Sequence, residues 1–307
     1  MSSGIISNLK RLEHYFPVLK AILKSRGSEP EMSISSLSDL NNMIWGLPKG
    51  KLTVVAARTS VGKSAFSLQL AYDLALHGKR VLFLSLEMTV EDLLERLFCY
   101  EHRINNRHLI RGQFGAYEQK YDVFCTDLGR LKLAFTDCIG KHWSEVEEIL
   151  NALDPKPDAV FIDHINAIRT DGTNAKRAID DYLINLVEIT KHNNVSMIIC
   201  CQINRDNQKD DDKTPQLHEL KGSGNLEEMA DRVIMLHWPH RYQRQGESIP
   251  KNKYIVIVGK NRSGPTGYIN VHFEPEYGIF SNARKTEKVL EQAKDNSQLQ
   301  LLNQMTE

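Results

Sequence analysis

The stretch AARTSVGKS, residues 56–64, constrains the fold more than any other part of the chain. It follows the apolar run LTVVAA and opens a helical pattern over Lys63–His77, and a strand, a loop and a helix in this order form a phosphate-binding loop. The motif GxxxxGK[ST] is matched except at its first position, where Ala57 replaces glycine. A chance GKS at a helix start is the alternative, and the flanking strand and helix argue against it.

The chemistry of such a loop is the binding of ATP with Mg²⁺. Backbone N–H groups of the loop and of the helix N-terminus converge on the phosphates. We expect Lys63 to reach the β- and γ-phosphate oxygens and Ser64 to coordinate Mg²⁺. The predicted nucleotide-binding residues are Arg58, Thr59, Ser60, Val61, Gly62, Lys63 and Ser64.

Two carboxylates stand at the ends of predicted strands. Asp163 ends the run AVFID, where a carboxylate beside the phosphate loop is placed to bind the water shell of Mg²⁺. Glu87 follows the run RVLFLSL and is our candidate for the general base that polarises the attacking water. The alternative is that Glu87 caps the next helix, because Thr89 and Glu91 begin a new amphipathic stretch.

Short β-branched runs alternate with longer amphipathic stretches from Leu52 onward, which predicts an α/β fold with a twisted, mostly parallel sheet flanked by helices. Beyond those already named, we predict strands in KLAFT, VSMIICCQI, ADRVIML and KYIVIVGK. The Gly-Pro and Thr-Gly pairs of NRSGPTG suggest a turn between two antiparallel strands at a sheet edge.

The two ends of the chain differ from the middle. Apolar residues at helical spacing predict a helix over Ile5–Lys24, which either packs back on the domain or docks on a neighbouring subunit. From Ala283 onward the chain is polar, and a helix or disorder are both compatible with it. We therefore predict an N-terminal helix and linker over 1–30, an ATPase domain over 31–282 and a polar tail over 283–307.

Composition excludes few functions. The 39 basic and 39 acidic residues cancel, so contact with nucleic acid depends on local basic groups. The cysteines number five and show no metal-ligand spacing, which indicates reduced core residues of a cytosolic protein. No apolar run approaches the roughly 20 residues that span a bilayer, so we expect a soluble, cytoplasmic protein without a membrane partner.

Two stretches flanked by charge follow predicted strands. RTDGTNAKR, with Lys176, follows the strand of Asp163, and RDNQKDDDK, which begins at Arg205, follows VSMIICCQI. Both are candidate DNA-contacting loops, with solvated surface loops as the alternative.

The set of motifs resembles the C-terminal motor domain of hexameric replicative helicases of the DnaB type, over roughly Leu40–Phe280. The family's loop reads like AARxSxGK, and its SLEM element stands intact here, which implies that Glu87 is the catalytic carboxylate. The metal strand, commonly IDYLQL, reads IDHINA, so Asp163 matches while His164 and Asn166 depart from the pattern. The resemblance implies a RecA-like P-loop ATPase fold.

Further roles follow only from this resemblance. IICCQINR resembles the family's SQLNR and implies that Gln202 senses the γ-phosphate. LHELKGSGNLEEMADRVIML resembles a segment that faces single-stranded DNA, which implies backbone-phosphate contacts from Lys221, Gly222 and Gly224.

GKNRSGPTG matches KxRxGPxG and implies that Lys260 and Arg262 reach the γ-phosphate held by a neighbouring subunit, with Arg262 as the arginine finger. Hydrolysis would then need a homo-oligomer, which we expect to be a hexamer. Catalysis is thus assigned to Lys63, Glu87, Gln202, Lys260 and Arg262.

The family usually carries an N-terminal collar domain, whereas about forty residues precede the motor here. We expect a short-form helicase or a fragment of a longer one, bacterial or encoded by a phage or plasmid. It would translocate on single-stranded DNA during replication and work with a loader or other replication proteins. A RecA- or RadA-like recombinase and a nucleotide-dependent ring scaffold or loader are the rival functions.

Overall fold

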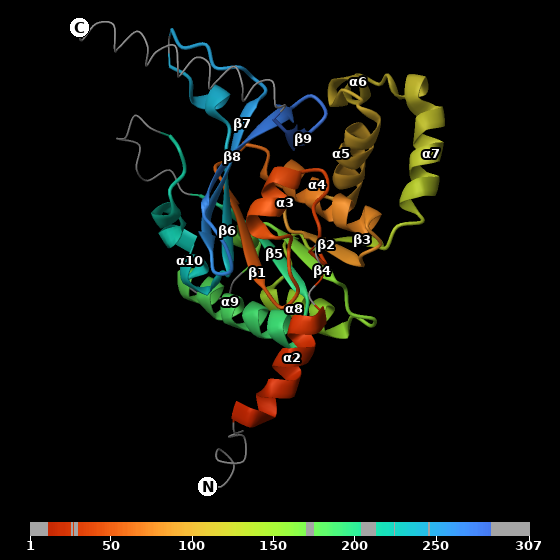
Figure 1. The fold of residues 1–307 in the computed structure, drawn as a ribbon. Helices are drawn as coiled ribbons and strands as arrows, with labels where there is room; N and C mark the ends of the chain where they lie inside the picture. The colour runs from red at the N-terminus through yellow and green to blue at the C-terminus, as the bar shows by residue number, and fades with distance from the viewer. Residues whose placement is uncertain are drawn as a thin grey trace, which may run out of the picture.

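The computed structural model describes residues 12–25, 27, 30–169, 175–203, 213–223, 225–244 and 246–283. A nine-stranded sheet runs through the molecule in the order β3-β2-β4-β5-β1-β6-β7-β8-β9 (Figure 1). The strands are β1 (Leu52–Ala57), β2 (Val81–Ser85), β3 (Leu133–Asp137), β4 (Ala159–Asp163), β5 (Ser196–Gln202), β6 (Arg232–His237), β7 (Lys253–Asn261), β8 (Gly267–Glu274) and β9 (Ile279–Asn282).

Strands β1–β6 are parallel and β7–β9 pair antiparallel, so the predicted mostly parallel α/β sheet is confirmed. The predicted hairpin is β7–β8. It does not form the edge of the sheet, because the short strand β9, which the sequence did not predict, pairs with β8.

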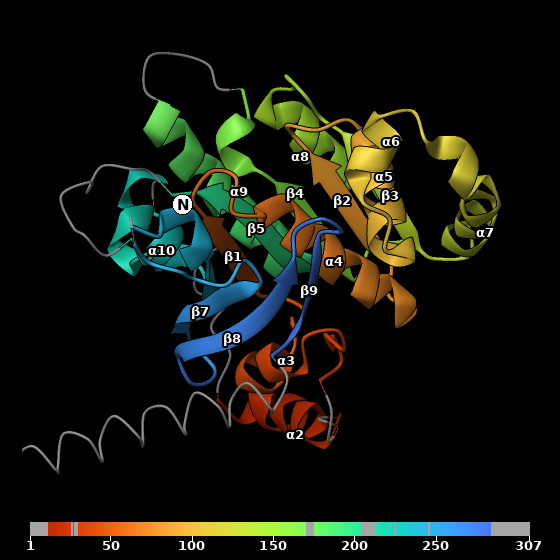
Figure 2. The same cartoon turned by 90° about the horizontal axis from the view of Figure 1, so that it is seen from above.

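The helical segments are η1 (Leu12–Tyr15), α2 (Phe16–Ser25), α3 (Ser38–Ile44), α4 (Lys63–Leu76), α5 (Val90–His102), α6 (Asn106–Ile110), η2 (Phe114–Tyr117), α7 (Glu118–Leu128), α8 (Trp143–Ala152), η3 (Ile165–Ala167), α9 (Ala175–His192), η4 (Leu217–Ser223), α10 (Leu226–Met229) and η5 (Pro239–Tyr242). Helices α3 and α4 lie on one side of the sheet and α8 and α9 on the other (Figure 2).

Both faces of the sheet are therefore buried along β1, β2, β4, β5 and β6, whereas β3 is only partly buried and β7 and β8 alternate buried with less buried residues. Along β1, Val55 and Ala57 belong to the core beneath α4, whereas Val54 and Ala56 belong to the core beneath α8 and α9. This explains why the parallel strands are nearly continuous apolar runs instead of alternating patterns.

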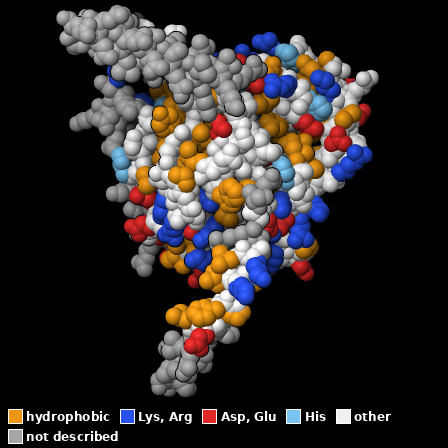
Figure 3. Space-filling model, in the orientation of Figure 1, with side chains coloured by type: hydrophobic (Ala, Val, Ile, Leu, Met, Phe, Trp, Pro, Cys, Tyr) orange, Lys and Arg blue, Asp and Glu red, His pale blue; other side chains and the backbone are white. Residues whose placement is uncertain are grey.

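Helix α2 extends away from the domain (Figure 1). Hydrophobic side chains gather on its surface (Figure 3), and Phe16 and Leu19 are more than half exposed. The sequence left open whether this helix packs on its own domain or docks on a neighbouring subunit. In the structure it does not pack on its own domain. Residues 5–11 of the predicted helix, and the predicted tail beyond Ala283, lie outside the described residues.

Four of the five cysteines are buried, as expected of core residues. Cys125 on α7 is exposed, which corrects the prediction for that position. Among the helices that the structure describes, none has the length and apolar character needed to cross a bilayer.

Candidate functional site

The phosphate loop joins β1 to α4 and contains one position that requires glycine. Gly62 has a φ of +105°, and a Cβ built there would lie 3.3 Å from the Cζ atom of Phe280. Ala57, which replaces the first glycine of the motif, is the last residue of β1 and pairs with Gln202 and Leu236 of the neighbouring strands. Alanine is suitable there because the backbone is still an ordinary buried strand.

Two contacts that the sequence did not predict hold this loop from the side of the antiparallel strands. The hydroxyl of Tyr254 in β7 donates to the carbonyl of Val61 at 3.0 Å. The guanidinium of Arg241 in η5 donates to the carbonyl of Ser60 at 2.6 Å. Nothing local in either segment signals this role, because both contacts depend on how the distant chain folds back.

Lys63, Ser64 and Asp163 meet above the carboxyl ends of β1 and β4. Lys63 Nζ donates to Asp163 Oδ1, and the Ser64 hydroxyl is also hydrogen-bonded to this carboxylate. Burial alone would raise the pKa of Asp163, but Lys63 and Ser64 outweigh burial and hold that pKa below its usual value. A carboxylate that stays charged in a buried place suits a cation and its water shell.

These oxygens fit the Mg²⁺ ion that a phosphate loop implies. The Ser64 hydroxyl and the Asp163 carboxylate are hard oxygen donors, and Mg²⁺ is commonly held by one or two carboxylates together with substrate phosphates. Within the described part of the chain, no cluster of three or more His, Cys, Asp or Glu side chains could hold a metal ion.

Glu87 lies just beyond β2, beside the end of β4. The register pairs Ser85 with Asp163, which brings Glu87 next to His164 with 3.1 Å between Glu87 Oε2 and His164 Nδ1. The Glu87 side chain is 62% exposed. The next helix is capped by Thr89, whose side chain accepts from the N–H of Asp92, so Glu87 is not the cap that the alternative interpretation required.

His164 is buried between charged groups. Burial and the nearby charge of Lys63 lower the pKa of His164. The sequence marked this residue only as a departure from the family pattern.

Gln202 ends β5 and connects the loop to the neighbouring strand. Its Nε2 donates to the hydroxyl of Thr59 at 3.0 Å. Its own N–H donates to Asn166 Oδ1, also at 3.0 Å. Gln202 is thus held at the phosphate loop, where a polar side chain can respond to what the loop binds.

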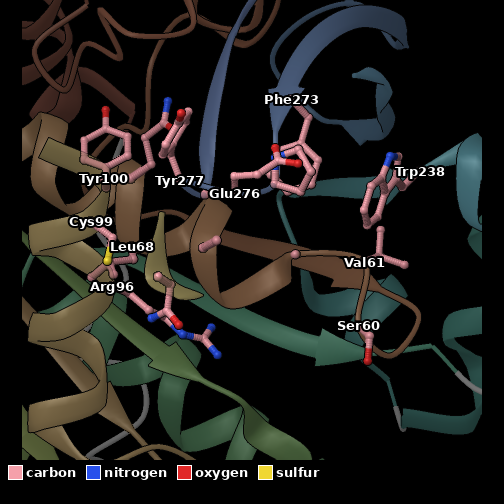
Figure 4. A pocket seen from close by; sticks show the side chains of 16 residues that line it. Ser60, Val61, Leu68, Arg96, Cys99, Tyr100, Trp238, Phe273, Glu276 and Tyr277 are labelled. Carbon is pink, nitrogen blue, oxygen red and sulfur yellow. The ribbon is translucent and has the colours of Figure 1, made fainter. Parts of the chain in front are cut away.

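Two hollows meet at the phosphate loop. One, of about 380 Å³, lies over Arg58, Lys63, Glu87 and Gln202. The other, of about 370 Å³, is more apolar, and its walls include Tyr100, Trp238, Phe273 and Tyr277 (Figure 4). Ser60, Gly62 and Arg96 border both hollows, so together they offer a polar and an apolar compartment side by side.

Lys260 and Arg262 lie at the opposite edge of the sheet. Asn261 pairs with Arg232 at the start of β6, and the N–H of Arg262 donates to the carbonyl of Asp231. Both cations are held by carbonyls of α10, with Lys260 Nζ 2.6 Å from the Glu227 oxygen and Arg262 Nη2 2.8 Å from the Glu228 oxygen. Burial and the charge of Arg262 lower the pKa of Lys260.

The structure does not bring these two cations to the phosphate loop of the same chain. The loop follows the carboxyl end of β1, and the cations lie beside its amino end. Six residues of strand separate these ends, which is roughly 20 Å at 3.3 Å per residue.

The predicted DNA-contacting residues are only partly described. Lys221 and Gly222 lie in η4, and Lys176 lies in the first turn of α9, but the side chains of the two lysines are outside the described part. Gly224 and Arg205 lie outside the described residues altogether.

Comparison with known proteins matches most of the chain. A family model described as the DnaB-like helicase C-terminal domain matches residues 34–282. The replicative DNA helicase DnaC of Bacillus subtilis (strain 168) is 29% identical over 260 residues, covering 82% of this chain and 56% of that protein. The replicative DNA helicase DnaB of Geobacillus stearothermophilus is 27% identical over 292 residues, covering 92% of this chain and 63% of that protein. The chain thus spans less than two-thirds of the length of both relatives.

Solved structures show the same architecture. A structure described as an ATPase domain matches with a TM-score of 0.79 and 24% identity, covering 90% of this chain and 100% of that chain. A DnaB-like replicative helicase, described together with its interactions with primase, also matches with a TM-score of 0.79 and 24% identity, covering 89% of this chain and 69% of that chain. The predicted RecA-like fold is confirmed.

Proposed function

This chain belongs to the DnaB-like helicase C-terminal domain family, and from that premise we propose that it hydrolyses ATP to move along single-stranded DNA during replication. In this proposal several copies form a ring, which we expect to be a hexamer, and the complementary strand is displaced as the ring advances. Bacterial and plasmid-encoded relatives make the bacterial cytoplasm the proposed location.

One observation carries the proposal. Lys63, Ser64, Asp163 and Glu87 gather at one edge of the sheet, while Lys260 and Arg262 lie at the other edge. An arginine finger must reach the γ-phosphate, and the length of β1 separates Arg262 from the loop of its own chain. A neighbouring copy can supply the finger, so each complete site would lie between two subunits.

The residues at the loop would then divide the work of hydrolysis. The loop N–H groups and Lys63 hold the phosphates, and Ser64 and Asp163 hold Mg²⁺, which supplies charge stabilisation as the phosphoryl group transfers. Glu87 orients and polarises the attacking water. Gln202, bonded to Thr59 and ending the strand that leads to residues 204–212, is suited to pass the state of the loop toward the DNA side.

The two hollows fit the parts of a nucleotide. The phosphates would occupy the polar compartment above Lys63, and the base would occupy the apolar compartment near Trp238 and Tyr277. Arg96, which borders both compartments, would then lie beside the ribose and phosphates.

DNA contact is proposed at the segment around Lys221 and Gly224, with Lys176 and Arg205 as further candidates. Small residues allow the nucleic-acid backbone to approach N–H groups, and each lysine neutralises one phosphate. A loader or another replication protein as partner remains part of the proposal.

The similarity to replicative helicases favours this function over a recombinase. A ring scaffold that does not turn over ATP is disfavoured because the full set of Lys63, Glu87, Gln202 and Arg262 is present.

Steady-state ATP hydrolysis tests the proposal, with single-stranded DNA, duplex DNA or no DNA, over a range of protein concentrations. Stimulation by single strands that rises cooperatively with protein concentration supports a motor with sites between subunits. Turnover that is independent of DNA and of concentration contradicts it. A forked-duplex unwinding assay then separates a helicase from an ATPase that only binds DNA.

A further inference from the structure

His164 occupies a place where it can act on the reaction without touching the nucleotide. It follows Asp163 at the end of β4, and β4 lies directly beside β2, whose end leads to Glu87. The residue is only 9% exposed, so its ring is fixed by the surrounding protein. Glu87, in contrast, is mostly exposed, and its long side chain has considerable rotamer freedom to lose.

The Nδ1 atom of His164 is buried and has no hydrogen bond of suitable geometry among the described residues. Leaving such an atom without a hydrogen-bond partner is unfavourable. Oε2 of Glu87 is 3.1 Å away, a hydrogen-bond distance, and the angle between the groups is what excludes a bond. A small rotation of the exposed Glu87 side chain would correct that angle.

The ring can donate through Nδ1 both as a neutral tautomer and in its protonated form. A donor from a fixed ring would hold one carboxylate oxygen and leave the other free for a water molecule. General bases work only when their oxygen lies within hydrogen-bond reach of the proton that they attract. An unrestrained Glu87 would spend much of its time pointing away from that water.

We propose that His164 is a positioning residue that donates from Nδ1 to Oε2 of Glu87 and turns the second carboxylate oxygen toward the attacking water. This inference rests on the proposed ATP hydrolysis. It assigns a role to a residue at which the chain departs from the IDYLQL pattern.

Three variants of His164 separate positioning from packing. In His164→Asn the side-chain amide nitrogen can take the place of Nδ1, in His164→Gln the amide reaches the place of Nε2 instead, and in His164→Leu no donor remains. We expect kcat to fall about 10- to 100-fold in His164→Leu and in His164→Gln, because a misplaced base loses that much. His164→Asn should keep most of the turnover, and KM for ATP should stay near that of the wild type in all three.

Glu87→Gln provides the second arm of the experiment. If His164 acts through Glu87, adding His164→Leu to Glu87→Gln should not lower the residual kcat further. An additional loss of the same size as in the single variant overturns the proposal, as does equal turnover in His164→Asn and His164→Leu. Thermal unfolding of each variant shows whether lost activity reflects lost folding.

A spectroscopic readout keeps this inference separate from the proposed function. The ¹⁵N spectrum of labelled histidine reports which ring nitrogen of His164 carries a proton, with the signal assigned by its absence in His164→Asn. We expect a protonated Nδ1 whose shift changes in Glu87→Gln. An unchanged shift overturns the contact whether or not the chain hydrolyses ATP, whereas a wild-type chain without turnover overturns the proposed function.

Discussion

Arg58 of the phosphate loop and Glu219 of η4 form an ion pair of 2.8 Å, with only 14% and 7% of their side chains exposed. The guanidinium of Arg58 also lies over the ring of Tyr242, at 5.8 Å from its centroid. The ion pair therefore connects the start of η4 directly to the loop that is predicted to hold the nucleotide. Lys221 lies further along the same segment.

Replacing Glu219 with Gln should destabilise the fold and uncouple the loop from η4. The charge of Arg58 would stay largely buried without its partner, so we expect the free energy of unfolding in urea to fall by about 1.5–3 kcal/mol. Stimulation of hydrolysis by single-stranded DNA should fall more than the basal rate. The exposed pair Asp127 and Arg130 gives the control, because Asp127→Asn should change stability by less than about 1 kcal/mol. Equal losses in the two variants would contradict this prediction.

Replacing Lys63 with Ala should abolish hydrolysis. Lys63 is the ammonium group in contact with Asp163, and its loss removes a positive charge from the place where the phosphates are expected. Turnover is measured by phosphate release, and nucleotide affinity by a fluorescent ATP analogue. Lys79→Ala, beyond the other end of α4, is the matched control and should hydrolyse ATP like the wild type. Substantial turnover in Lys63→Ala would remove this residue from the site.

Much of the fold could be predicted because its signals are local. The loop at Gly62 requires a strand before it and a helix after it, and five of the six parallel strands are buried and largely apolar. Strand β9 was missed because it has only four residues. The segment with α6 and α7 was also missed, since α6 buries no residue and α7 buries only Phe124.

The geometry of the site could be predicted only in part. The sequence indicated that Asp163 ends one strand and that Glu87 follows another, but the distance between the two carboxylates depends on the order of the strands in the sheet. That order inserts β4 between β2 and β5, and it alone brings His164 beside Glu87. The contacts of Arg241 and Tyr254 with the loop depend in the same way on long-range folding.

Arg262→Ala should lower hydrolysis by about 10³-fold and leave nucleotide binding unchanged. The reason is distance, because Arg262 lies at the amino end of β1 and cannot meet the phosphates of its own chain. Mixing Arg262→Ala with Lys63→Ala subunits tests this directly, since some interfaces then combine an intact loop with an intact finger. Recovered activity in the mixture supports a shared site. Arg130→Ala serves as the control for removal of an exposed arginine.

Lys221→Ala should weaken binding to single-stranded DNA and lower the salt dependence of that binding by roughly one unit of slope. One lysine on a phosphate releases about one counterion, so the slope reports the contact itself. Fluorescence anisotropy at several salt concentrations gives both quantities, with Lys79→Ala as the control for lost surface charge. An unchanged slope would move the DNA contact away from η4.

Asp158 should make stability depend on acid. It receives a hydrogen bond from the N–H of Arg80 at 2.8 Å and pairs with Lys49 at 2.7 Å. Burial opposes the charge, but these two contacts outweigh it and hold the pKa of Asp158 below its usual value. A lowered pKa stabilises the fold above the unfolded value, near pH 4, and this stabilisation is lost as the pH falls further. Urea melts should therefore show Asp158→Asn less stable by about 1–2 kcal/mol at pH 7, and the difference should shrink below about pH 4. A difference that is independent of pH would mean that Asp158 acts through its shape and not its charge.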